Sequence, residues 1–288
     1  MAYFVLFASV FVDTIKNIFL NMFGKDYTKT YQDAFLFNAV CSIGALLLLI
    51  CIGPEFSISS YSMILAFFFA LVTAMAQFFL LMSMATGSMS FSVLFSYLGL
   101  VVPTLYSIFV GGQSVKAYQI VGLLLMIVTL YLCVGAKNET KITLKWIIYS
   151  VASFLAWGGV GLIQYLHQSS PHKEEISGFL IWSFVMMTIM FIVMYFIARR
   201  VTDEKPKYIV KSNATWIALG AGVIVGATNK VNLYLSGVLP SIVFFPIING
   251  GVIILSGIAS ILVFKEKLNK KQILGIILGI VSICLLGM

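Results

Sequence analysis

Ten long apolar runs follow one another along this chain, with only short polar segments between them. The runs cover residues 3–22, 34–52, 62–84, 89–110, 118–135, 145–166, 178–198, 213–235, 240–264 and 272–288. Each is close to the roughly 17–25 residues that an α-helix needs to cross the hydrocarbon core of a bilayer. A chain of this size cannot bury so many long apolar runs in one soluble core, so the runs predict ten transmembrane helices.

The composition agrees with a multi-pass membrane protein. Hydrophobic residues make up 61% and charged residues 10% of the chain, and the mean hydropathy is +1.06, which excludes an ordinary soluble protein. The run CSIGALLLLICI (41–52) is apolar on every face, whereas the strands of a membrane β-barrel alternate apolar and polar residues. We therefore predict an all-α integral membrane protein of the cell membrane, whose function takes place within the bilayer.

The positive charges gather in alternate loops. If successive loops lie on opposite sides of the membrane, one side carries fourteen Lys and Arg residues and the other only Lys116 and Lys173. The fourteen are Lys25, Lys29, Lys137, Lys141, Lys145, Arg199, Arg200, Lys205, Lys207, Lys211, Lys265, Lys267, Lys270 and Lys271. The positive-inside rule places that side in the cytoplasm and both termini outside. Topology thus accounts for the net charge of +8, and we expect no nucleic-acid partner.

We expect neither a cleaved signal peptide nor a metal site. The sequence MAYFVLFASVFVDTIK lacks the basic flank and small-residue cleavage site of a signal peptide, so we expect it to remain as the first span. Cys41, Cys51, Cys133 and Cys284 lie singly in apolar runs, without the paired spacing of zinc or iron–sulfur ligands. His167 and His172 flank the loop HQSSPHKEE, where we expect no metal and no cofactor.

A weak internal repeat relates the two halves of the chain. A shift of 150 residues aligns TGSMSFSVLF (86–95) with SGVLPSIVFF (236–245). Each half, 1–136 and 137–288, contains five predicted spans. Because five is odd, the halves would enter the bilayer in opposite orientations. This inverted repeat is characteristic of secondary transporters, which bind substrate near the midplane between the repeats.

Helix-weakening residues interrupt the spans at matching places. The ninth span reads VFFPIINGGVIIL (243–255), with Pro246, Asn249, Gly250 and Gly251 near its middle. The fourth span carries Gly99 and Pro103 at the corresponding depth. Such residues predict helix breaks, tolerated only where backbone is buried in protein or lines a watery space. Alternatively, the glycines simply permit close helix packing.

The first span carries Ser9, Asp13, Lys16 and Asn17 on one helical face. Asp13 falls close to the membrane midplane, where each charge costs about 2.5–3.5 kcal/mol on insertion scales. Charges at that depth face the bundle interior or water. Asp13 and Lys16 therefore form either an ion pair that fixes helix packing or a site for substrate or proton, with Asp13 as the candidate proton carrier.

A second polar group lies in the eighth span, where TNKVN places Lys230 between Asn229 and Asn232. Helical side chains lean toward the N-terminus, away from the nearer end of this span, so snorkelling to the interface is awkward for Lys230. A buried ammonium among amides suits a carboxylate or phosphate. Further candidates for the same substrate site are Gln77, Gln164, Asn249, Lys16, Tyr97, Trp157 and Trp182. The glutamines serve equally well as structural hydrogen-bonding groups between helices.

Two local patterns resemble the drug/metabolite transporter superfamily, specifically its EamA-like branch of ten-span carriers. The stretch AWGGVGLIQ (156–164) is similar to the Trp-Gly pattern of that branch, with Gln164 in the position of its polar residue and Lys16 as counterpart in the first span. The stretch LVFKEKLNKKQILGIILGIVSICLLG (262–287) resembles its final helix-turn-helix with an acidic turn residue, here Glu266. The first half departs from the pattern at Ser9–Val10 and Gly112–Gln113.

The resemblance implies a carrier of small organic solutes with both termini in the cytoplasm, opposite to the orientation that the loop charges favour. Our leading hypothesis is a secondary transporter that moves a small polar metabolite by alternating access, by exchange or with protons as the coupling ion. A lipid or lipid-linked-sugar translocator is the alternative. An intramembrane enzyme lacks support, because no Ser/His pair or metal cluster accompanies Asp13. A structural subunit would leave the buried charges without a purpose.

Overall fold

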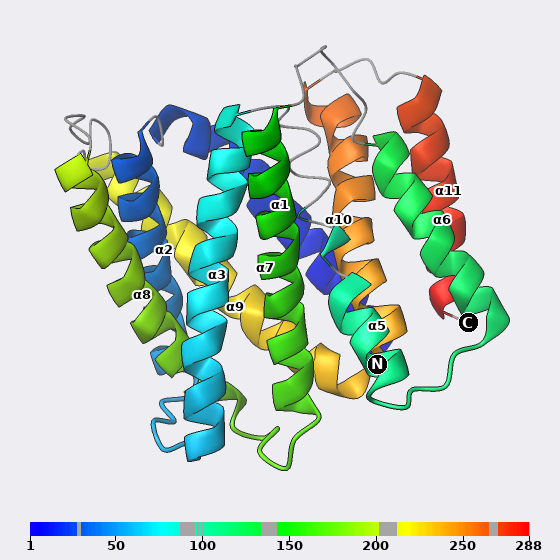
Figure 1. Cartoon of the computed structure of the whole chain (residues 1–288), viewed down its shortest axis with the longest axis horizontal. Helices are drawn as coiled ribbons and strands as arrows, with labels where there is room; N and C mark the ends of the chain where they lie inside the picture. The colour runs from blue at the N-terminus through cyan, green and yellow to red at the C-terminus, as the bar shows by residue number, and fades with distance from the viewer. Residues whose placement is uncertain are drawn as a thin grey trace. The chain divides into compact units, whose positions relative to one another are not determined.

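The computed structural model describes residues 1–27, 30–86, 96, 98–99, 101–133, 143–201, 212–264 and 270–287, and every regular element within them is an α-helix. Figure 1 shows these helices with their labels. They are α1 (Ala2–Tyr27), α2 (Tyr31–Ile52), α3 (Ser60–Thr86), α5 (Val101–Phe109), α6 (Ala117–Cys133), α7 (Leu144–Gln168), α8 (Ile176–Val201), α9 (Ser212–Val238), α10 (Ser241–Phe264) and α11 (Lys270–Gly287). The all-α prediction is confirmed.

The helices coincide with the predicted spans, except that only the second part of span 89–110 is described, as α5. Within the described residues, five stretches are long and apolar enough to cross a bilayer: Tyr31–Ile52, Ser60–Leu80, Leu144–Gln168, Ile176–Val201 and Ala214–Val238. Four shorter apolar stretches lie in α1, α6, α10 and α11. The chain is therefore a multi-pass integral membrane protein.

Short polar side chains fix where the helices begin. Thr30 caps α2, because its hydroxyl accepts a hydrogen bond from the backbone N–H of Asp33 at 3.1 Å. Ser59 does the same for α3 through the N–H of Ser62, and Thr143 for α7 through the N–H of Trp146. Each cap satisfies one of the donors that the first turn of a helix leaves unpaired.

Helix contacts divide the chain into two compact units. The first contains Met1–Thr14, Met75–Leu166 and Leu235–Met288, and the second Ile15–Ala74 and His167–Tyr234. In the first unit α6 lies along α11, and in the second α2 lies along α8 (Figure 1). Each unit draws helices from both halves of the sequence.

Within the second unit, α2 and α9 approach so closely that their backbones touch. A β-carbon at Gly222 would meet the carbonyl oxygen of Cys41, and one at Gly226 would lie 2.9 Å from the carbonyl oxygen of Ala45. On α2, a β-carbon at Gly44 would meet the carbonyl oxygen of Leu219. Small residues allow this approach, which is typical of helix pairs in membranes.

The predicted helix break in the ninth span is wrong. Helix α10 is continuous from Ser241 to Phe264, with Pro246 inside it and Gly250 and Gly251 in helical conformation. The glycines instead allow close packing against neighbouring side chains, which was the alternative explanation of the same residues. In the fourth span, Gly99 lies in a turn just before α5, and Pro103 lies in the first turn of α5, where proline is tolerated.

Candidate functional site

The first half of helix α10 is buried within the first unit, except at Asn249. All residues from Ser241 to Val252 are buried apart from Asn249, which is partly exposed. The side-chain N–H of Asn249 donates to the carbonyl oxygen of Phe245, one turn earlier, at 2.9 Å. The rest of its amide makes no hydrogen bond to the described residues. A polar group thus remains available in the otherwise apolar stretch 242–255.

Neighbouring helices of the unit pack around α10. A β-carbon at Gly250 would meet the side chain of Met126 on α6, and one at Gly251 would lie 2.8 Å from a methyl carbon of Val10 on α1. Helices α5 and α11 also pack against α10. The segment that carries Asn249 is therefore surrounded by helices from both sequence halves.

Helix α7 presents Trp157, Gly161 and Gln164 on one face, because they are four and three residues apart. A β-carbon at Gly161 would lie 3.1 Å from the ring of Phe245 on α10 and 2.8 Å from the ring of Pro103 on α5. Gln164 is buried. The indole nitrogen of Trp157 is also buried, and it has no hydrogen-bond partner in the described part of the chain.

Asp13 lies on the buried stripe of α1, with 5% of its surface exposed. Leu6, Ser9, Val10 and Thr14 share this stripe. The hydroxyl of Thr14 donates to the carbonyl oxygen of Val10 at 2.7 Å, which satisfies it within the helix. The side chain of Lys16 lies outside the described residues, so its pairing with Asp13 stays a prediction.

Pairs of serine hydroxyls connect α7 to neighbouring segments of the first unit. Ser83 of α3 is hydrogen-bonded to Ser150 at 2.6 Å, and Ser96 is bonded to Ser153 at 2.7 Å. All four hydroxyls are buried. Gln77 of α3 is partly buried in the same unit. Tyr97 lies outside the described residues.

Lys230, Asn229 and Asn232 belong to α9 in the second unit, and all three are partly buried. The side-chain N–H of Asn229 donates to its own helix, at the carbonyl oxygen of Val225. The ammonium of Lys230 lies 3.6 Å from the position that a β-carbon on Gly53 would take. Gly53 is the C-cap of α2, so the cation lies near the negative end of a helix dipole. Lys230 makes no hydrogen bond or ion pair to the described residues.

Glu175 joins two loops of the second unit. Its carboxylate accepts hydrogen bonds from the backbone N–H of Ser59 at 3.0 Å and from the Ser59 hydroxyl at 2.8 Å. Nδ1 of His172 lies 3.2 Å from the other carboxylate oxygen. Burial raises the pKa of Glu175, but the hydrogen bonds from Ser62, Ser59 and His172 outweigh it and lower the pKa from 4.5 to about 2. The anionic carboxylate therefore holds the α2–α3 and α7–α8 loops together.

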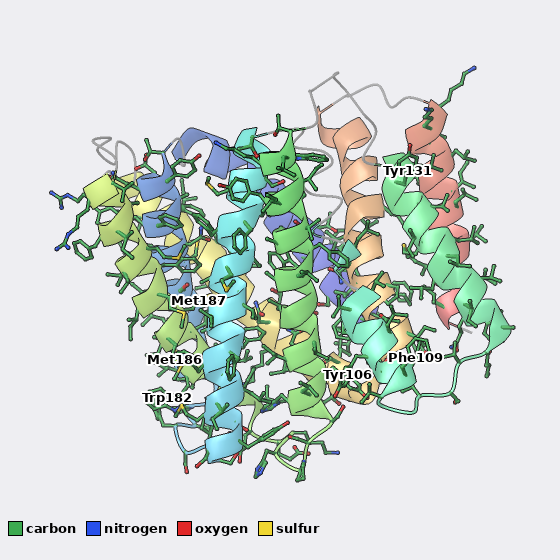
Figure 2. The ribbon with its side chains drawn as sticks, in the orientation of Figure 1. Tyr106, Phe109, Tyr131, Trp182, Met186 and Met187 are labelled. Atoms are coloured by element: carbon green, nitrogen blue, oxygen red, sulfur yellow. The ribbon has the colours of Figure 1, made fainter. Side chains whose placement is uncertain are left out.

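Trp182, near the start of α8, belongs to the same connection (Figure 2). Its indole N–H donates to the carbonyl oxygen of Phe56 in the α2–α3 loop at 3.0 Å. Trp182, a further candidate for the substrate site, thus has a hydrogen-bond partner in this loop.

Comparison with known proteins identifies the chain through its second half. A sequence model of the EamA-like transporter family matches residues 144–288, which is half of the chain. The chain belongs to the EamA-like transporter family. The match covers α7 to α11, and with them Trp157, Gln164, Lys230 and Asn249.

The fold extends over the whole chain in a solved structure described only as "Crystal structure of protein". It is 11% identical, has a TM-score of 0.73 and covers 100% of this chain and 98% of its own. No curated protein matches the sequence. The identity is low, so this likeness shows the fold alone, and the family match shows a transporter.

The predicted site residues fall into two groups in this EamA-like protein. Asp13, Gln77, Trp157, Gln164 and Asn249 belong to the first unit. Lys230, Asn229 and Asn232 belong to the second. The described geometry connects α7 and α10 directly, through Gly161 and Phe245. That the two groups form one site stays a prediction.

Two acidic residues were absent from the predicted site. Asp33 is fully buried at the start of α2, where the Thr30 hydroxyl donates to its carboxylate at 2.9 Å. Glu175 connects the α2–α3 and α7–α8 loops. The signal for Asp33 was its spacing of three residues from Thr30, a helix-capping pattern. The sequence shows that Glu175 lies in the charged loop HQSSPHKEE, but it does not show that the distant residue Ser59 is its partner. Among the described residues, no three His, Cys, Asp or Glu side chains gather as a metal site.

Proposed function

We propose that this EamA-like protein is a secondary transporter that moves a small polar organic metabolite across the cell membrane by alternating access. The family match over residues 144–288 is the observation that carries the proposal. The buried polar side chains of α1 and α7 support it, since polar groups at membrane depth are costly and mark solute or ion pathways.

The pattern of helix contacts supports two inverted repeats, 1–136 and 137–288. Counting ten spans, α2 and α8 are the second and seventh, α5 and α10 the fourth and ninth, and α6 and α11 the fifth and tenth. Each pair is five spans apart, and each pair is in contact. A two-fold axis that exchanges the repeats brings equivalent helices together in this way.

In the proposed mechanism, Asp13 carries the coupling proton and Lys230 contacts an anionic group of the substrate. The ammonium of Lys230 has no described partner, so it is free to bind a carboxylate or phosphate. Gln77, Gln164, Asn229, Asn232, Asn249, Lys16, Tyr97 and Trp157 complete the proposed substrate site. Alternating access would then expose this site to each side of the membrane in turn.

The proposal is tested by binding and by transport with the same panel of solutes. We would measure the melting temperature of the purified protein against amino acids, sugar nucleotides, phosphorylated metabolites and organic cations. A solute at 100 times its Kd stabilises the protein by about 2.7 kcal/mol. Uptake of the stabilising solute into proteoliposomes is the expected result. Accumulation of a lipid, rather than any soluble compound, in the opposite leaflet would favour the lipid-translocator alternative instead.

Variants separate the two proposed roles. Asp13→Asn should abolish dependence on a proton gradient while solute exchange continues. Lys230→Ala should weaken binding of anionic solutes by about tenfold or more, as expected when a hydrogen bond to a charged group is lost. Lys173→Ala, in an exposed loop, is the matched control. Unchanged proton dependence in Asp13→Asn, or unchanged affinity in Lys230→Ala, contradicts the corresponding role.

A further inference from the structure

Two tryptophans of this protein differ in the state of their indole N–H. Trp182 donates to the carbonyl oxygen of Phe56 at 3.0 Å. Trp157 has a buried Nε1 with no hydrogen-bond partner among the residues that the structure describes. Buried donors are nearly always paired in folded proteins, and each unpaired one calls for a physical explanation. One explanation is that the donor forms its hydrogen bond only when a solute is bound.

The directions of three helices show what lies level with Trp157. Helix α5 runs beside α7 in the same direction, because Val102 contacts Gly158 and the ring of Tyr106 packs on that of Tyr165. Helix α10 runs in the opposite direction, since the backbone N–H of its first residue, Ser241, donates to the side chain of Gln113, beyond the end of α5.

Trp157 and Asn249 are therefore at the same level. Gly161 of α7 faces the ring of Phe245 on α10. Trp157 precedes Gly161 by four residues, and Asn249 follows Phe245 by four residues on the antiparallel helix. Four residues advance a helix by about 6 Å in each case. The step from Gly161 to Trp157 and the step from Phe245 to Asn249 go in the same direction along the bundle. Both residues therefore remain on the sides of α7 and α10 that face each other.

Apolar side chains lie next to this level. Phe245 and Pro103 lie at Gly161, one turn away. Asn249 is the partly exposed residue in the buried stretch Ser241–Val252, and its amide retains hydrogen-bonding capacity beyond the bond to Phe245. An apolar wall with a few precisely placed polar groups is the usual character of a small-molecule site.

We propose that the indole N–H of Trp157 donates a hydrogen bond to a carbonyl or carboxylate oxygen of the transported solute, whose apolar part packs at Phe245, beside Asn249. This rests on the proposed transport function and specifies the chemistry of its substrate. The solute is a small molecule that carries such an oxygen next to an apolar body. In the absence of solute the indole N–H has no partner among the residues that the structure describes.

The state of the indole N–H is measurable in the full-length protein by ultraviolet resonance Raman spectroscopy. The difference between the spectra of wild type and Trp157→Phe isolates Trp157. Without solute, we expect the signature of an indole N–H that is not hydrogen-bonded. Saturating L-leucine should convert it to the bonded form, whereas isoamylamine, which lacks the carboxylate, should not. A bonded N–H without solute, or no response to L-leucine, overturns the proposal.

Binding and stability give a second readout with a matched control. Trp157→Phe should raise the Kd of L-leucine about tenfold, the scale of one lost hydrogen bond, without lowering the melting temperature. Trp182→Phe should lower the melting temperature and leave the Kd unchanged, because the Trp182 N–H donates its hydrogen bond to Phe56 in the α2–α3 loop. Equal affinities in wild type and Trp157→Phe overturn the proposal. The proposed function itself fails separately, if no solute of the panel enters proteoliposomes of the wild type.

Discussion

The glycines of α9 and those of α10 meet different kinds of neighbour. On α9, Gly222 and Gly226 face backbone carbonyl groups of α2. On α10, Gly250 and Gly251 face the side chains of Met126 and Val10. Both helices need small residues for close packing, but only the second kind of neighbour can move by changing a rotamer.

This difference indicates which contacts can adapt. Backbone-to-backbone contact between α2 and α9 fixes the spacing of these helices, since neither main chain can retreat without shifting its whole helix. The loops of the same unit are fixed in addition by Glu175. The packing of α10 depends on side chains, which can rearrange locally. The α2–α9 contact is therefore fixed by the main chain, whereas the packing around α10 can adjust through side-chain rotamers.

The largest effect is expected at the backbone contact of α9. Gly222→Ala places a methyl group against the carbonyl oxygen of Cys41, and the two helices must separate. We expect a loss of about 3 kcal/mol of stability, at the upper end of the usual cost of overpacking. The melting temperature of the purified protein, followed by size-exclusion chromatography after heating, measures the change.

Gly220→Ala is the matched control on the same helix. A β-carbon at Gly220 would have no neighbour within 4 Å, so this variant should be as stable as wild type or slightly more stable. Equal melting temperatures for the two variants would show that α2 and α9 are not in backbone contact, and the comparison with α10 would fail.

A smaller effect is expected from the loop connection of the second unit. Glu175→Gln removes the charge that accepts hydrogen bonds from Ser59, and we expect a loss of about 1.5–2 kcal/mol, typical of hydrogen bonds to an ionised group. Glu174→Gln, at the exposed neighbouring position, should have almost no effect. The difference in melting temperature between each variant and wild type at neutral pH tests both expectations.

The effect of Glu175 should depend on pH in a defined direction. Its pKa in the folded protein, about 2, is lower than the ordinary value of 4.5, so unfolding takes up a proton between these two values. The stabilisation is therefore complete above pH 4.5 and is lost as the pH falls toward 2. The stability gap between wild type and Glu175→Gln should shrink over that range. A gap that stays constant would mean that the charge does not hold the loops together.

Sequence reasoning located the helices well because apolar length is a one-dimensional property. The ends of α7 and α10 lie within a few residues of the predicted spans. It failed at Pro246, since a proline weakens a helix in isolation but the surrounding bundle can keep the helix continuous. Composition cannot show how strongly neighbouring helices support a segment.

The candidate site was predictable only by residue type. Polar residues such as Trp157 and Asn249 were recognisable because they interrupt apolar runs. That the Trp157 indole lacks a partner, while Trp182 has one in a loop 126 residues away, depends on the rotation and register of several helices. The same limit applies to Gly222 and Gly250, since sequence shows that both are small but not whether backbone or side chain lies opposite.

The smallest effect, and the sharpest test of the comparison, is expected at Gly250. The β-carbon of Gly250→Ala would meet the flexible end of Met126, which can move aside, so we expect a loss of less than about 1 kcal/mol. Combining it with Met126→Ala should reveal favourable coupling of about 1 kcal/mol, because the shortened side chain leaves room for the new methyl group. The parallel pair Gly222→Ala and Cys41→Ala should show none, since the obstacle there is the main-chain carbonyl, which Cys41→Ala retains. Double-mutant cycles on melting curves measure both couplings. Coupling at Cys41, or its absence at Met126, would remove the distinction between a fixed and an adaptable contact.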